Sequence, residues 1–166
     1  KAFAENPFQT ENSELLMQKV GENSNLQSLL ANAKINQTLE TIAENDKTHY
    51  RIYNQTLGTF SETNTSYFKS SIGGYHAVKL RRYDDLINEY FSKMDTVRIP
   101  KILNMLNTKY MIFGNAEKPD AVVNPNANGN AWFVSNVKFV ENPNEEIKQI
   151  GEIDSKEVAI ISKDDQ

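Results

Sequence analysis

Four basic side chains and no acidic one occupy the segment Tyr67–Tyr83 (YFKSSIGGYHAVKLRRY), in a chain whose formal net charge is −4. The four are Lys69, Lys79, Arg81 and Arg82. Two serines and two glycines in the same segment can expose backbone N–H groups, which bind anions at turns and helix N-termini. The segment is therefore a candidate site for a phosphate, on a lipid carrier or a bilayer headgroup. The alternative is structural, with the arginines paired to an acid one helical turn later and the glycines in a tight turn.

A second group of residues has the side chains that bind sugars. Trp132 is the only tryptophan, and it follows Asn130 in the stretch GNAWFV. Exposed indole rings stack on sugar faces, although a single tryptophan in an apolar strand also fits a core position. Tyr75 and His76 follow the glycine pair and are further candidates. His76 alternatively fits a hydrogen-bonded core residue, because it shares the apolar side of the helix predicted there.

Other chemistry finds little support in the sequence. There are two histidines, His49 and His76, no cysteine and no calcium-binding loop, so no metal site is predicted. Nucleotide-binding glycine motifs and a Gly-x-Ser-x-Gly nucleophile motif are absent. Adjacent acids such as Asp84 and Asp85 cannot oppose each other across a substrate, as paired-carboxylate catalysis requires. We therefore predict no catalytic residue and no cofactor, and the acidic net charge argues against nucleic acid as a partner.

The hydrophobic pattern predicts an α+β fold, a single domain with a small mixed or antiparallel sheet packed against several helices. Residues 1–47 are expected to form a helical N-terminal segment, with helical pattern from Ser13, and residues 48–166 the α+β domain. The expected helices are 25–44, Tyr75–Lys93, Lys101–Asn107 and Asn142–Gln149. The first is expected to break near Lys34–Asn36, because Leu26 and Leu30 share one side while Leu39 and Ile42 fall nearly opposite. The apolar face of the second is Leu80, Tyr83, Ile87, Tyr90, Phe91 and Met94. The expected strands are His49–Thr56, Lys109–Phe113, Asp120–Val123, Ala131–Val140 and Glu157–Ser162, with a turn around Gly114–Asn115 between the second and the third.

Length and composition agree with this organisation. A chain of 166 residues fits one domain that can bury a core of its own. Its longest apolar runs, such as Tyr110–Phe113, are four residues, whereas a membrane-spanning helix needs about 20. Because the chain begins at Lys1 without an initiator methionine, we expect it to be a piece of a longer protein.

Four stretches of the chain resemble a known family. They are Asn64–Tyr83 (NTSYFKSSIGGYHAVKLRRY), Leu103–Tyr110 (LNMLNTKY), Gly129–Val134 (GNAWFV) and Asn142–Glu146 (NPNEE). In this order and spacing they resemble YfhO-like multi-spanning bacterial membrane proteins, over roughly His49–Ser162. The family is similar to the GT-C glycosyltransferases, which transfer a sugar from a polyprenyl-phosphate carrier outside the cytoplasm.

The resemblance implies a non-catalytic, extracytoplasmic domain on the periplasmic side of the inner membrane. Its implied partners are the membrane-embedded remainder of the same polypeptide, a glycan acceptor or polyprenyl-phosphate sugar, and anionic lipid headgroups. No catalytic residue is carried over, because the catalytic acids of such enzymes lie in loops near membrane helices that this chain does not contain. The alternatives are an independent carbohydrate- or protein-binding module of the cell envelope, and a hydrolase built from scattered residues such as His76 and Asp84.

Overall fold

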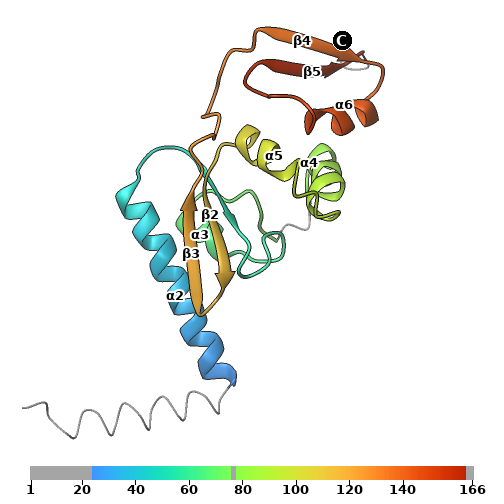
Figure 1. Ribbon diagram of the computed structural model, residues 1–166. Coiled ribbons are helices and arrows are strands. Elements are labelled where there is room, and N and C mark those ends of the chain that lie inside the picture. Colours follow the sequence, from blue (N-terminus) through green and yellow to red (C-terminus); the bar gives the residue numbers. More distant parts are fainter. Residues whose placement is uncertain (1–23, 76–77, 164–166) are drawn as a thin grey trace, which may run out of the picture.

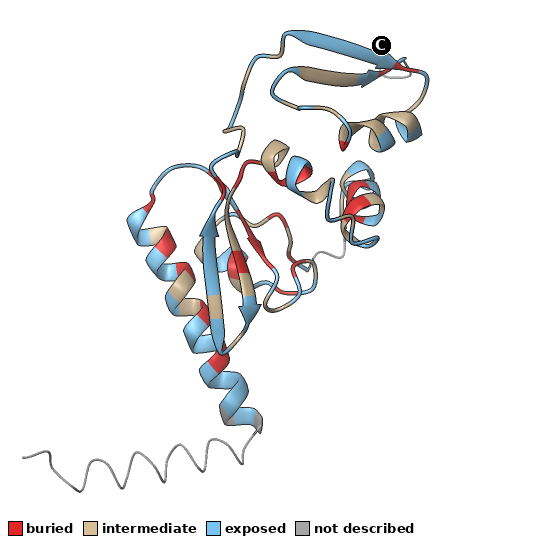
Figure 2. Ribbon diagram, viewed as in Figure 1, coloured by how far each residue is buried: buried red, intermediate tan, exposed pale blue. Residues whose placement is uncertain are grey.

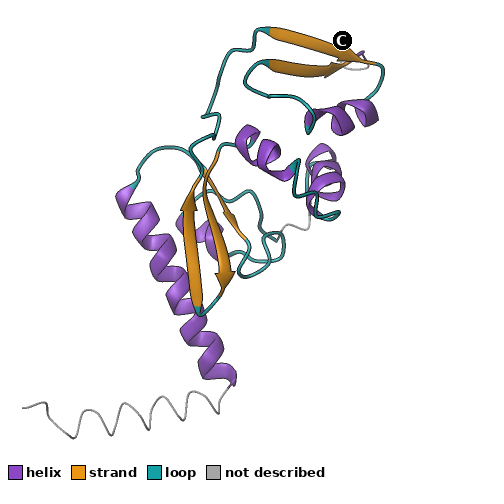
Figure 3. Ribbon diagram, in the orientation of Figure 1, coloured by secondary structure: helices purple, strands orange, loops and turns teal. Residues whose placement is uncertain are grey.

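Helices surround two small β-sheets in the computed structural model, which describes residues 24–75 and 78–163 (Figures 1 and 3). The arrangement confirms the predicted α+β class. The helical pattern expected from Ser13 lies outside the described residues, which begin with α2. The helices are α2 (Ser24–Asn45), α3 (Asn64–Phe68), α4 (Arg81–Leu86), the π-helix η1 (Ile87–Phe91), α5 (Ile99–Met105) and α6 (Pro143–Ile150). The strands are β1 (Arg51–Asn54), β2 (Thr108–Asn115), β3 (Lys118–Val123), β4 (Asn136–Val140) and β5 (Val158–Ser162).

The larger sheet is mixed and has the order β1-β2-β3, with β1 parallel and β3 antiparallel to β2. The hairpin between β2 and β3 was predicted correctly, but its turn lies at residues 116–117, just beyond Gly114–Asn115. Gly114 has a φ of 86°, and a Cβ there would lie 2.6 Å from the carbonyl oxygen of Lys118. The close approach of the two strands therefore requires glycine at this position.

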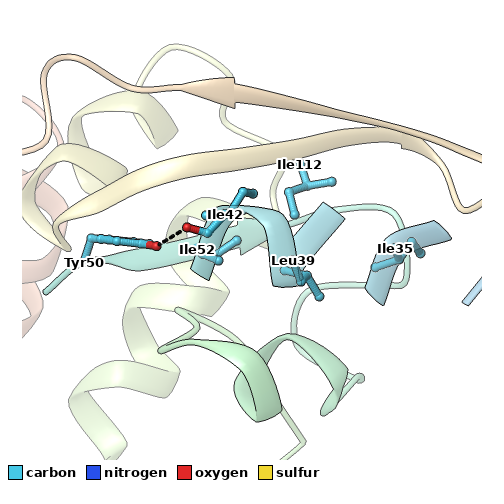
Figure 4. Packing of buried hydrophobic residues seen from close by; sticks show 6 residues of the cluster. All are labelled: Ile35, Leu39, Ile42, Tyr50, Ile52 and Ile112. Carbon is cyan, nitrogen blue, oxygen red and sulfur yellow. Dashed lines mark hydrogen bonds between the residues drawn. The ribbon is translucent and has the colours of Figure 1, made fainter. Parts of the chain in front are cut away.

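Helix α2 packs against this sheet through one apolar stripe (Figure 4). The predicted break near Lys34–Asn36 is wrong, because the helix runs without interruption through these residues. Leu29 and Leu30 are exposed, so the helix buries only one face. A break that would turn a second face toward the core is therefore unnecessary. The stripe and the residues it meets on the sheet side form one buried cluster: Ile35, Leu39, Ile42, Tyr50, Ile52 and Ile112.

The helix predicted over Tyr75–Lys93 is wrong at its start, because Tyr75 and residues 78–80 are described and are not helical. Helix α4 begins at Arg81 and continues directly into η1. Leu80 and Met94, expected on the apolar face, are exposed instead. The positions that are buried lie in the middle of the predicted stripe: Leu86, Ile87 and Tyr90.

Close backbone contacts explain why this helix starts late. A Cβ on Gly73 would lie 1.7 Å from the carbonyl oxygen of Thr59, so the two backbones touch here. The N–H of Gly74 donates to the same oxygen at 2.9 Å, and Gly74 has a φ of 108°. Downstream, the Tyr83 hydroxyl donates to the carbonyl of Ile72. Tertiary contacts therefore hold Gly73 and Gly74 in a non-helical conformation directly before the predicted start of the helix.

Strands β4 and β5 are parallel and connected by α6, so the C-terminal part is one βαβ unit. The predicted helix is confirmed: Pro143 opens it, and the Asn142 side chain caps it by accepting from the N–H of Glu145 at 3.0 Å. The predicted strand Ala131–Val140 is wrong in its first half. Its partner strand starts at Val158, opposite Asn136, so the preceding residues have no strand to pair with.

A buried tyrosine connects this unit to the helices below it. The Tyr90 hydroxyl donates to the carbonyl of Ile147 at 2.5 Å and accepts from the N–H of Gly151 at 3.0 Å. A Cβ at Gly151 would lie 2.5 Å from the Tyr90 ring, so only glycine fits. Figure 2 shows buried residues around this contact and where α2 faces the sheet, and a largely exposed β4.

Candidate functional site

Three of the predicted binding residues, Lys69, Asn130 and Trp132, line one cavity of about 400 Å³. Its volume falls in the range of about 300–1,000 Å³ that is usual for small-molecule sites. The cavity lies where the loops around β1 and β2 meet the connection from β3 to β4. Its polar and aromatic lining comes from segments far apart in the sequence: His49, Tyr50, Arg51, Lys69, Ser70, Asn107, Asn130 and Trp132.

Strand β1 and the residue before it divide their side chains between core and cavity. Tyr50 is buried, and its hydroxyl donates to the carbonyls of Ile42 at 3.3 Å and Asp46 at 3.1 Å. Burial, together with the charge of Asp46, raises the pKa of Tyr50 to about 12. Lys69 lies with its Nζ 4.5 Å above the Tyr50 ring and 3.3 Å from the Asp46 carbonyl. The neutral tyrosine thus holds a cation at the cavity wall.

Asn107 joins two walls of the cavity. It stands between α5 and β2 with a φ of 54°, a left-handed conformation that asparagine tolerates better than most residues. Its side-chain Nδ2 donates to the carbonyl of His49 at 3.1 Å and to Oδ1 of Asn130 at 2.9 Å. The second bond fixes the Asn130 side chain through its oxygen and leaves the amide N–H₂ group of Asn130 for a ligand.

Trp132 is half-buried, so it combines the two roles considered for it. Its Nε1 donates to the carbonyl of Ser155 at 2.6 Å, which fixes the ring orientation. The indole also lines a second, apolar cavity of about 330 Å³ together with Met105, Ile150 and Ile160. One part of the ring therefore supports packing of the βαβ unit, and another part is available in the first cavity.

The cavity lining has two cations and no carboxylate. The Arg51 Nη1 donates to the carbonyl of Leu106 at 3.0 Å, and neither Arg51 nor Lys69 forms an ion pair with a carboxylate among the described residues. The carboxylate of Asp46 is taken up elsewhere, by Lys109 Nζ at 2.5 Å. The bond from Lys109 and a further one from Thr48 hold the pKa of Asp46 well below its usual range. The positive charge of the cavity therefore remains without an internal counter-ion.

The other predicted anion ligands lie outside this cavity. Lys79 stacks over the ring of Phe60 at 5.7 Å and lines a smaller cavity of about 200 Å³. Arg82 pairs with Glu146 of α6 at 3.6 Å, which connects α4 to the βαβ unit. Arg81 is exposed on α4. The four basic residues of the segment Tyr67–Tyr83 therefore lie in four different environments.

The two remaining glycan candidates give no support to this cavity. Tyr75 is exposed and does not line it. His76 lies outside the described residues, so its predicted position is not tested.

Three residues of the cavity were missed at the sequence level. His49 was considered only as a metal ligand, whereas Arg51 and Asn107 were not considered. The alternation around Tyr50 and Ile52 does place Arg51 on the opposite face, and this was the one available signal. Nothing in the spacing indicates that residues near position 50 meet residues near position 130.

The described part of the chain contains no cluster of three or more histidine, aspartate or glutamate side chains suited to a metal ion. No helix in that part has the length and apolar character needed to span a bilayer. Comparisons with family models, with curated proteins and with solved structures found no match for this chain.

Proposed function

We propose that this chain is a non-catalytic glycan-binding domain, and that it forms an extracytoplasmic part of a polytopic membrane protein of the GT-C glycosyltransferase-like type. The convergence of Lys69, Asn130 and Trp132 on one cavity carries the glycan-binding half of the proposal. The resemblance of four stretches to YfhO-like proteins supports the membrane half. In this role the domain presents an acceptor glycan or a carrier-linked sugar to a catalytic centre in the membrane-embedded part of the polypeptide.

The geometry of the cavity suits a sugar ring. A half-buried indole offers an apolar surface for the C–H face of a pyranose, and a nearby amide offers donors for its hydroxyl groups. Both side chains are held in place: Trp132 by Ser155, and Asn130 by Asn107. Such preorganisation reduces the entropy lost when a small ligand binds.

Intrinsic fluorescence tests the proposal directly, because Trp132 is the only tryptophan in the chain. Titration with glucose, galactose, mannose and N-acetylglucosamine, and with their 1-phosphates, should shift or quench the emission in a saturable way for at least one sugar. Asn130→Ala should weaken that response, and Asn45→Ala, an exposed asparagine at the end of α2, should not. A flat titration with every probe, in fluorescence and in NMR amide shifts of the cavity residues, would refute the glycan-binding role.

A second contact, with the bilayer surface, is favoured by a separate observation. Val78 and Leu80 are 90% and 83% exposed, and Arg81 follows them directly. Exposed apolar side chains beside cations are typical of interfacial membrane contacts. Vesicles containing phosphatidylglycerol should therefore retain the protein at low salt, and Leu80→Ser with Arg81→Gln should release it. Equal retention by purely zwitterionic vesicles would contradict an electrostatic contact.

The alternative function is an independent carbohydrate- or protein-binding module. This module would use the same cavity but would need no membrane-embedded partner. The two hypotheses therefore predict different parent genes. Predicted membrane-spanning helices in the same open reading frame would support the accessory domain, and a short secreted product would support the module.

A further inference from the structure

We infer that the cavity selects sugars that carry an anionic group, with Arg51 and Lys69 as its charge-recognising residues. This inference rests on the proposed glycan-binding role and adds a substrate class to it. The shared chemistry is a phosphate or carboxylate attached to a sugar ring.

The first argument is electrostatic. Lys69 and Arg51 both reach the cavity, and their present acceptors are neutral carbonyl groups, of Asp46 and Leu106. An anionic acceptor adds to such hydrogen bonds a Coulomb attraction between opposite charges, which a neutral carbonyl does not offer. An anionic ligand group can therefore replace or share the carbonyl contacts with a gain in free energy. A neutral sugar gains nothing comparable from these two side chains.

The second argument is that the protein keeps competing acids away from this charge. Asp46 is adjacent in space to Lys69, and its carboxylate would be the natural partner of that lysine. Lys109 and the hydroxyls of Thr48 and Tyr110 occupy the carboxylate instead, at 2.5, 2.5 and 3.1 Å. Only the backbone carbonyl of Asp46 faces Lys69. The arrangement separates one acid from one cation that lie side by side, so the cation remains available to a ligand.

The third argument is the division of the cavity wall. The cations come from β1 and from the end of α3, while Asn130 and Trp132 come from the connection between β3 and β4. Asn107 bridges the two sides through His49 and Asn130. A ligand that fills the cavity therefore meets charge on one wall and an aromatic ring with an amide on the other. A sugar ring with one anionic substituent has this same polarity.

Paired probes test the inference. Each neutral sugar of the fluorescence panel is compared with its 1-phosphate, with glucuronate as the carboxylate counterpart of glucose and with inorganic phosphate alone. For at least one pair, the charged sugar should bind about tenfold tighter or more. Its affinity should fall as salt is raised, whereas that of the neutral sugar should not. Preference for the 1-phosphate over glucuronate, or the reverse, identifies the anionic group.

Charge-removing variants locate the effect. Arg51→Gln and Lys69→Gln should each weaken the charged sugar much more than the neutral sugar, so that the two affinities become similar. Lys69→Arg should retain most of the preference, which guards against a folding defect in the glutamine variant. Lys118→Gln on β3 removes the same charge away from the cavity and should change nothing.

The outcomes separate this inference from the proposed function. Equal affinity for charged and neutral sugars would overturn the charge selection and leave glycan binding intact. Inorganic phosphate binding as tightly as the sugar phosphates would overturn glycan binding, because the sugar would add nothing. An unchanged preference in the double variant Arg51→Gln with Lys69→Gln would overturn the assignment of these two residues.

Discussion

Replacing Asn107 tests both the backbone and the side-chain part of the cavity architecture. The side chain donates two hydrogen bonds, at 3.1 Å to His49 and at 2.9 Å to Asn130, each worth about 1 kcal/mol net. The backbone has a φ of 54°, and an ordinary L-residue pays about 1 kcal/mol more there than asparagine does. Asn107→Ala should therefore lower the free energy of unfolding by about 3 kcal/mol in total.

Asn107→Gly separates the two contributions. It loses the same two hydrogen bonds but occupies the left-handed region without strain, so its destabilisation should be smaller, about 2 kcal/mol. Urea denaturation followed by far-UV circular dichroism measures both values. In thermal unfolding the difference should appear as about 2–4 °C in favour of the glycine variant, given the size of the chain.

Two results would refute this reasoning. If the alanine variant were as stable as the glycine variant, the left-handed backbone would contribute nothing. If the glycine variant matched the wild type, the two hydrogen bonds would not hold the walls of the cavity together.

Three further predictions concern stability. Because the bond from Lys109 lowers the pKa of Asp46, the contribution of this carboxylate to stability is complete above the usual aspartate pKa of about 3.9 and is lost as the pH falls through the lowered value. Asp46→Asn should therefore flatten the loss of stability between pH 6 and acid, and urea midpoints that run parallel to those of the wild type would contradict this. Met94→Gly should raise the free energy of unfolding in urea by about 0.5–1 kcal/mol, because it relieves a φ of 53° at an exposed side chain. A lower free energy of unfolding would show that the methionine side chain contributes packing. Tyr90→Phe removes the hydroxyl that bonds to Ile147 and Gly151, so it should lower the free energy of unfolding by about 1–3 kcal/mol. Hydrogen exchange should accelerate more in α6 than in β2, and equal acceleration in both would contradict a local role of this contact.

The elements that were predicted correctly are those whose ends are determined by residues close in sequence. Pro143 is the first residue of α6, and Pro100 is the second residue of α5, so a proline in the first turn indicated both helices. The hairpin of β2 and β3 was visible because both strands and their turn lie within about 15 residues of chain. These features need no knowledge of distant parts of the molecule.

Tertiary contacts decided the elements that the sequence misplaced. The helical pattern begins at Tyr75, but the contacts of Gly73 and Gly74 with the Thr59 carbonyl fix the backbone just before it in a non-helical path, and α4 begins only at Arg81. In α2 the leucines on one side suggested a second buried face, and only the exposed position of Leu30 shows that there is none. Likewise, residues 131–135 have strand-like composition but no partner strand. In each case the structure depends on a residue distant in sequence, which the local pattern cannot identify.

The candidate residues were recovered in part for the same reason. Lys69, Asn130 and Trp132 were singled out by type, but Asn130 and Trp132 were grouped with Tyr75 and His76 as sugar-binding candidates. Lys69 was grouped separately, with the cations of the segment Tyr67–Tyr83. The structure groups all three with Arg51 and Asn107 instead. Arg51 was overlooked because an arginine in a β-strand is usually an outward-facing solvated residue, and only its proximity to Lys69 gives it a binding role.

The position of the cavity links its ligand to the fold. Asn107 precedes β2, Asn130 and Trp132 lie between β3 and β4, and the indole is bonded to Ser155 shortly before β5. A ligand that touches both walls binds only the native arrangement, so it should stabilise the fold by about 2.7 kcal/mol at a hundredfold excess over its Kd. Asn107→Gly loosens the walls and should weaken charged and neutral sugars alike. Arg51→Gln keeps the Asn107 bonds that join the walls and should weaken charged sugars much more than neutral ones, so the two variants distinguish positioning from direct recognition.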